Sequence, residues 1–264
     1  MIGFSARKSP LEKEWESLIK KEQDFLKKRQ EKKDSFLNQK LAEKVPEKLQ
    51  STLDGAFFKA FTVIFEKGTS IIEKTYRRDD IEKKHKINAF ADETLQNRKS
   101  IKKFSKEAGN AGNKNLLISG VAGVGMGLLG IGLPDIPVFT GMILKNIYEI
   151  ALHYGYEYDS TKERYFILLL IQGAVSYGDT LLEIDKKVNE YIKEEKLPLD
   201  YQRVKQIEET AGVLSKELLY MKFVQGIPVV GAIGGAVDVV YMQRITEYAK
   251  MKYQRRFLEK KSKK

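Results

Sequence analysis

Two glycine-rich segments of very low charge constrain the fold more than any other feature of the chain. Residues 115–144 carry one charged residue, Asp135, and hold six glycines between Gly120 and Gly132. Residues 223–242 carry Asp238 as their only charge. Each glycine inside a helix costs about 1 kcal/mol relative to alanine. A chain tolerates this cost where backbones pack very closely or where lipid replaces water. The two segments therefore predict closely packed helices, either in the core or at a membrane.

The glycine spacing predicts how these helices meet. Residues four apart lie on one helix face, and small residues at that spacing let two backbones approach closely. We expect helices over 116–133 and 228–244 to contact each other antiparallel, or to hold an apolar ligand between them. The predicted contact residues are Gly123, Gly127, Gly231, Gly235 and Asp238. Asp238 lies among valines, where an unpaired carboxylate is costly, so it either pairs with a cation or tyrosine or lines a ligand cavity.

The rest of the chain predicts an all-α fold. Apolar residues recur at three- and four-residue steps, and no period-two alternation or hairpin signal appears. We expect one multi-helix domain of eight or nine helices with the two glycine-rich helices at its centre. Its predicted parts are a peripheral amphipathic helix in 1–45, the helical domain in 46–258 and a basic tail in 259–264.

Local signals predict several helix ends. Residues 77–92 are charged and ambiguous, whereas 93–108 read as a helix that Gly109 closes. Asp135 is well placed to cap the helix that Gly155 ends. Two further helix starts have capping-box spacing; these are Ser160 with Glu163 and Thr180 with Glu183.

Composition narrows the chemistry and the partners. The 264 residues have a net charge of +11 and no cysteine. Disulfides, cysteine-ligated metals and thiol nucleophiles are therefore excluded, and anionic partners are favoured. The N-terminus lacks the apolar core of a secretory signal, so the expected location is the cytoplasm.

A basic segment near the C-terminus is the candidate contact with an anionic surface. Lysine and arginine alternate there with aromatic residues, and each such cation contributes about 1 kcal/mol near an anionic membrane. The candidate contacts are Lys250, Lys252, Arg255, Arg256, Lys260 and Lys261. A solvated helix end is the competing interpretation. Nucleic acid is not the expected partner, because no recognition motif accompanies the charge.

The remaining motifs do not predict a cofactor or a metal. Residues 125–130 fit GxGxxG, but a dinucleotide site needs flanking strands and none is predicted. Glu149 and His153 share a helix face, yet a metal needs three or four ligands, so we interpret them as an intrahelical pair. Residues 115–134 have the length of a membrane span. Pro134 and Asp135 interrupt the apolar run, so a buried helix or a shallow membrane contact is favoured.

Four segments carry a resemblance to a known family. They are GLPDIP at 132–137, LKNIYEIALHYGY at 144–156, DSTKER with Phe166 at 159–166, and IPVVGAIGG at 227–235. In these segments, in this order, the chain resembles the EcsC family of bacterial proteins. The resemblance implies an all-α protein without established catalytic residues. It also implies proximity to a membrane transporter, because the family takes its name from a protein encoded beside an ABC transporter.

The sequence therefore predicts a non-enzymatic helical protein without a cofactor. We expect it to associate peripherally with the inner, anionic face of the cell membrane, as an accessory of a membrane protein. The alternative is a soluble carrier that holds a lipid or other apolar ligand between the glycine-rich helices.

Overall fold

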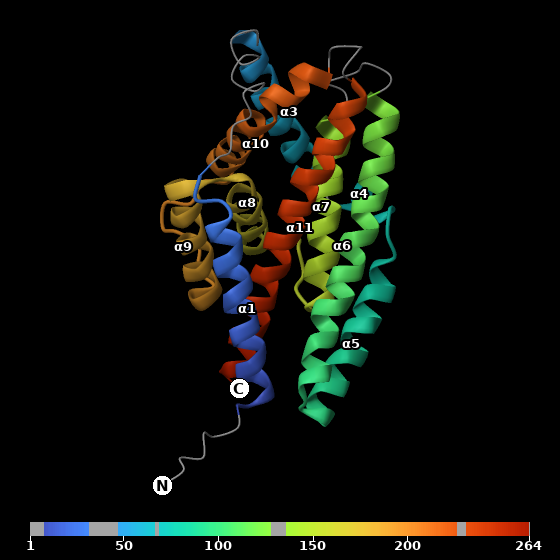
Figure 1. The fold of residues 1–264 in the computed structure, drawn as a ribbon, viewed down its shortest axis with the longest axis vertical. Coiled ribbons are helices and arrows are strands. Elements are labelled where there is room, and N and C mark those ends of the chain that lie inside the picture. Colours follow the sequence, from blue (N-terminus) through green and yellow to red (C-terminus); the bar gives the residue numbers. More distant parts are fainter. Residues whose placement is uncertain (1–7, 32–46, 67–68, 128–135, 226–230, 264) are drawn as a thin grey trace.

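A computed structural model describes residues 8–31, 47–66, 69–127, 136–225 and 231–263 (Figure 1). Within the helices, the structure describes the backbone but not the side chains of residues 47, 71, 113–127, 220–225 and 231–238. The described regular structure is entirely helical and consistent with one domain, which confirms the predicted fold class. The helices are α1 (Pro10–Lys27), α3 (Glu47–Glu66), α4 (Ser70–Glu73), α5 (Arg78–Leu95), α6 (Arg98–Gly127), α7 (Ile136–His153), α8 (Thr161–Val175), α9 (Gly178–Glu194), α10 (Arg203–Gln225) and α11 (Gly231–Ser262).

The C-terminal helix α11 is the centre of the fold. It packs against α1, α6, α7, α8, α9 and α10, and Figure 1 shows it running along the length of the molecule. Large side chains of its second half, among them Tyr248 and Tyr253, are fully buried. The other helices therefore share one core through α11.

The predicted helix end at Gly109 is wrong. Helix α6 passes through Gly109 without interruption, and the preceding helix, α5, ends at Leu95. Gln96 closes α5 by adopting the left-handed conformation, with φ at 44°. At Gly109, an added Cβ would lie 3.1 Å from the Nζ atom of Lys250 on α11. This glycine therefore makes room for a neighbouring helix.

Helices α6 and α11 lie very close to each other at Gly112. A Cβ at this position would lie 2.6 Å from Cγ2 of Thr246, which is shorter than any normal carbon contact. Because Gly109 faces Lys250 and Gly112 faces Thr246, the two helices run antiparallel. The same register, continued along both helices, predicts that Gly123 lies opposite Gly235 and Gly127 opposite Gly231. Those four residues and Asp238 lie outside the described side chains, so this contact stays a prediction.

The N-terminal helix is amphipathic and packs one face on the core. Helix α1 packs on α11 and α6, and its Leu18 and Phe25 are buried. Its Glu22 is also buried and forms an ion pair with Lys252 of α11. Residues 32–46 lie outside the described structure.

Two predicted capping boxes have different outcomes. Ser160 caps α8, because its Oγ accepts a hydrogen bond from the Glu163 amide at 3.1 Å. Thr180 does not begin α9, which starts two residues earlier at Gly178. The amide of Gly178 donates to the carbonyl oxygen of Arg29 at 2.9 Å. This contact with the chain after α1 fixes the backbone at the start of the helix.

The close approach at Gly112 gives a stability prediction. Gly112→Ala should lower the free energy of unfolding by about 1–3 kcal/mol, because the new methyl group overpacks the α6–α11 contact. Gly55 on α3 is the matched control, since no atom lies within 4 Å of its potential Cβ. Gly55→Ala should raise stability by up to about 1 kcal/mol through helix propensity alone. Urea unfolding measures both, and equal effects of the two substitutions would disprove the close contact.

Candidate functional site

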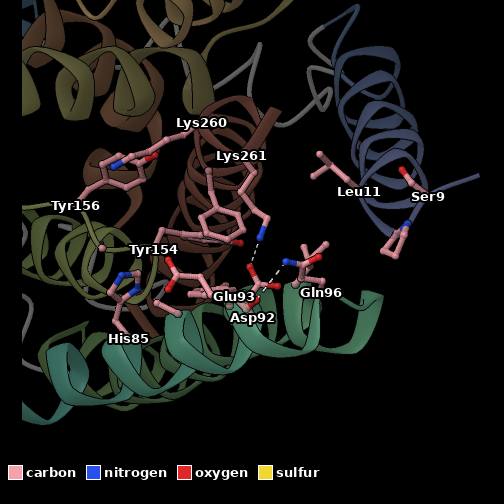
Figure 2. A pocket seen from close by; sticks show the side chains of 16 residues that line it. Ser9, Leu11, His85, Asp92, Glu93, Gln96, Tyr154, Tyr156, Lys260 and Lys261 are labelled. Atoms are coloured by element: carbon pink, nitrogen blue, oxygen red, sulfur yellow. Dashed lines mark hydrogen bonds and ion pairs between the residues drawn. The ribbon is translucent and has the colours of Figure 1, made fainter. Parts of the chain in front are cut away.

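A cavity of about 530 Å³ lies where α1, α5, α6 and α11 meet the loop that follows α7 (Figure 2). Helix α5 lines one wall, and the end of α11 lies across from it. The side chains come from five separated parts of the chain. The lining is Ser9, Pro10, Leu11, His85, Ala89, Asp92, Glu93, Gln96, Ile101, Phe104, Tyr154, Gly155, Tyr156, Phe257, Lys260 and Lys261.

Aromatic rings form the apolar part of this cavity. The Phe104 and Phe257 ring centroids lie 4.5 Å apart, and Tyr154 contacts Phe257 at 5.8 Å. His85 packs on Phe104 at 5.6 Å. Leu11 and Ile101 extend the same apolar surface. Such a lining favours a ligand with an apolar or aromatic body.

His85 is held in a defined orientation at the edge of the cavity. Its Nδ1 lies 3.1 Å from the carbonyl oxygen of His153. Because a carbonyl only accepts hydrogen bonds, Nδ1 carries a proton. Gly155 has φ at +79°, and a Cβ there would lie 2.3 Å from Nε2 of His85. Glycine is therefore required at this turn by both its backbone conformation and the histidine ring.

The polar part of the cavity is close to charge-neutral. Asp92 is buried, forms an ion pair with Lys261 and accepts a hydrogen bond from Ser100 at 2.7 Å; Figure 2 draws the Asp92–Lys261 pair across the cavity. Lys260 and Glu93 are exposed at the rim. An apolar floor with charges of both signs around it suits an amphiphilic ligand.

The C-terminal basic segment is mostly engaged inside the protein, which corrects its assignment as a membrane contact. Lys252 is 1% exposed, and its ammonium group lies 2.9 Å from Glu22, 2.8 Å from Asp185 and 2.9 Å from Asn189. These three contacts use all three donors of the lysine. They join α1, α9 and α11.

The arginines that follow are paired in the same way. Arg255 donates two hydrogen bonds to Glu22, from Nε at 2.9 Å and from Nη2. Arg256 is buried, with Nη1 2.6 Å from Glu163 and Nε 3.1 Å from Glu195. Among the six predicted surface contacts, only Lys250 and Lys260 form no ion pair with another described residue.

Glu149 and His153 are both buried on α7, and their intrahelical pairing stays a prediction. Glu149 is bound by Lys145 one turn earlier on α7, at 2.5 Å. Burial lowers the pKa of His153 to about 4, because an imidazolium is poorly solvated there. No group of three or more His, Asp or Glu side chains in the described part of the chain could hold a metal ion.

Sequence reasoning did not find the cavity. His85, Phe104, Tyr154 and Phe257 lie on four elements and follow no shared motif. The available signals were local, such as Gly155 after the helix end and the aromatic residues within the basic segment. Neither signal indicates which helices meet.

The buried His153 predicts a pH dependence of stability. Its pKa is about 4 in the folded protein and 6.5 when unfolded. Between these values the unfolded chain binds more protons, so stability falls as the pH drops from 6.5 towards 4, by about 3 kcal/mol in total. His153→Gln should remove this part of the pH dependence. Urea unfolding at pH 4.5, 5.5 and 7 measures it, and parallel pH profiles for both proteins would contradict the prediction.

Comparisons with known proteins identify the family. None of the helices in the described residues is long and apolar enough to cross a membrane. Neither curated proteins nor solved structures give a match to the chain. The pattern of the EcsC protein family matches residues 12–258, which include most of α1 and most of α11. The chain therefore belongs to the EcsC protein family.

Proposed function

We propose that this EcsC protein is a non-enzymatic protein that associates peripherally with the anionic, cytoplasmic face of a membrane. The family resemblance adds a membrane transporter as the proposed partner. The observation that carries the proposal is a lysine-rich groove between α1 and α6. It replaces the C-terminal basic segment as the membrane-contacting surface.

The α1–α6 groove is open and strongly basic. Its volume is about 780 Å³, and six cations line it against two carboxylates. One of these carboxylates, Glu14, is already bound by Arg98 at 2.5 Å. The other five cations are exposed lysines that form no ion pair with another described residue. They are Lys21, Lys99, Lys102, Lys103 and Lys106.

The lysines of α6 form one continuous face. Lys99, Lys102, Lys103 and Lys106 follow each other at steps of three, one and three residues, which places all four on one side of the helix. The opposite side, with Ile101, Phe104 and Ala108, is buried. A helix of this kind presents its charges together to a surface.

A carrier function is the second candidate, and the cavity of Figure 2 favours it. The sequence placed the ligand between helices 116–133 and 228–244, most of whose side chains lie outside the described structure. The described cavity lies instead between α1, α5 and α11. Its aromatic floor and charged rim suit one amphiphilic molecule.

The membrane proposal predicts that binding depends on where charge is removed. Replacing Lys99, Lys102, Lys103 and Lys106 by glutamine should weaken binding to phosphatidylglycerol-containing vesicles by up to about 4 kcal/mol, since each cation contributes about 1 kcal/mol. Flotation of the protein with these vesicles at low salt measures the effect. Added salt should reduce wild-type binding as well, because it screens exposed charges.

The matched control removes the same charge from another face. Lys187, Lys193, Lys196 and Lys205 are exposed on α9, α10 and the segment between them. Replacing these four by glutamine should leave flotation nearly unchanged. Equal losses for both quadruple variants would show that only net charge matters, and absence of wild-type flotation at every salt concentration would refute membrane association.

The carrier candidate predicts a ligand that co-purifies with the protein. Native mass spectrometry should reveal a bound amphiphile on the wild type. Ala89→Trp should remove it by filling the cavity, because Ala89 lines the wall on α5. Phe90→Trp is the control, since Phe90 is 72% exposed on the same helix. A wild-type protein without ligand, or equal occupancy in both variants, would argue against this function.

A further inference from the structure

A second cavity contains two cations without carboxylate partners. It has a volume of about 350 Å³ and lies between the end of α1 and the middle of α11. Lys250 lines it from α11, and Arg29 lines it from the chain just after α1. Both side chains are partly buried. Neither forms an ion pair with any residue in the described ranges.

Lys250 differs from the paired cations around it. Lys252, two residues further on, has two carboxylate partners, whereas the ammonium group of Lys250 lies against the backbone of Gly109. Burial and the nearby charge of Lys21 lower the pKa of Lys250. Glu247, which also lines this cavity, partly offsets that effect, but it forms no ion pair with Lys250 in the described structure. A partly buried cation without an ion-pair partner is costly to a fold. The position of Lys250 is therefore better suited to a bound anion than to stability.

Arg29 offers unused hydrogen-bond donors to the same cavity. Its guanidinium group stacks on the ring of Phe25 at 3.6 Å, and Nη1 donates a long hydrogen bond of 3.4 Å to the Phe25 carbonyl. Its Nε is buried and has no hydrogen-bond partner in the described structure. A planar guanidinium that is held by stacking is well suited to bind an oxyanion.

The charge and size of the cavity indicate which anion fits. Four cations line it, Lys21, Lys28, Arg29 and Lys250, against the carboxylates Asp24 and Glu247. The excess of two positive charges matches a phosphate monoester, which carries about −1.5 to −2 near neutral pH. The rest of the lining includes Phe25 and Met251, which leaves apolar surface for a small organic group.

We propose that this cavity binds the phosphate group of a small phosphomonoester or of a phosphomonoester lipid, with Lys250 and Arg29 as its cationic contacts. The cavity shares Lys21 and Ser105 with the α1–α6 groove, but none of the four α6 lysines of the proposed membrane surface lines it. The phosphate group belongs either to a lipid in a membrane or to a metabolite in solution. The same two side chains would bind it in both cases.

The test compares Lys250→Met with Lys252→Met in the full-length protein. Lys250→Met should raise the melting temperature by about 2–4 °C without ligand, because it removes a partly buried charge that has no ion-pair partner in the described structure. Lys252→Met should lower it, because Glu22 and Asp185 lose their partner. If Lys252→Met does not fold, Lys260→Met at the exposed rim of the other cavity serves as the control, with no change expected.

Ligand binding is measured with three probes, inorganic phosphate, glycerol 3-phosphate and vesicles that contain phosphatidic acid. The wild type should bind at least one probe, and Lys250→Met should weaken that binding about tenfold or more, since it loses a charge-assisted contact. A response to the soluble probes assigns a metabolite. A response to the vesicles alone assigns a lipid if Lys250→Met weakens it, because the α6 lysines of the proposed membrane surface are unchanged in that variant. The folded control variant should bind like the wild type.

Two outcomes would overturn the proposal. One is a wild type that responds to none of the three probes, and the other is a Lys250→Met variant that binds like the wild type or is destabilised. Flotation with phosphatidylglycerol vesicles distinguishes a failure of this proposal from a failure of the membrane proposal. Lys250→Met should float normally, whereas the quadruple α6 variant should float poorly and still bind the soluble probe.

Discussion

The buried ammonium group of Lys252 is the interaction on which the arrangement of the helices depends. It brings Glu22 of α1, Asp185 of α9 and its own helix α11 to one point, with all three of its donors used. Tyr248, one turn earlier, donates to Asp185 at 2.7 Å. A buried ion pair contributes little net stability relative to apolar residues, but removal of one partner costs about 3–5 kcal/mol. The cluster therefore links α1 and α9 to α11 through carboxylates that are costly to bury without a cation.

This use of charge changes how the net charge of +11 should be understood. Much of the C-terminal basic segment neutralises carboxylates of other helices, and Arg256 does so for Glu163 on α8. The cations that we propose as contacts for partners lie elsewhere, in the lysine face of α6 and in the cavity with Lys250. The two places have different physical character. Exposed lysines on α6 give a salt-sensitive attraction to a surface, whereas partly buried cations favour one anion of defined size.

Glycines determine how closely the helices pack around α11. Gly112 allows contact with Thr246, and Gly173 of α8 lies against the ring of Tyr248, where a Cβ would be 2.8 Å from Cε1. Gly112 lies three residues before the low-charge segment at 115–144, and Gly173 lies within an apolar helix far from it. The glycine count of a segment is therefore an incomplete guide. A glycine allows close packing only where a side chain of the neighbouring helix lies directly opposite it.

The sequence by itself determined the helical class, because apolar spacing, Ser160 at a helix start and Gly155 at a helix end act over a few residues. It also indicated the family through short segments in a fixed order. Only the tertiary structure decided which charges are available. Lys250 and Lys252 are two residues apart on one basic helix, yet Lys252 meets two carboxylates and Lys250 faces a cavity. The partners of Lys252 are 230 and 67 residues away in the chain, at Glu22 and Asp185. The physical reason is that charge pairing and cavity formation depend on contacts between distant helices, and local sequence patterns do not encode these contacts.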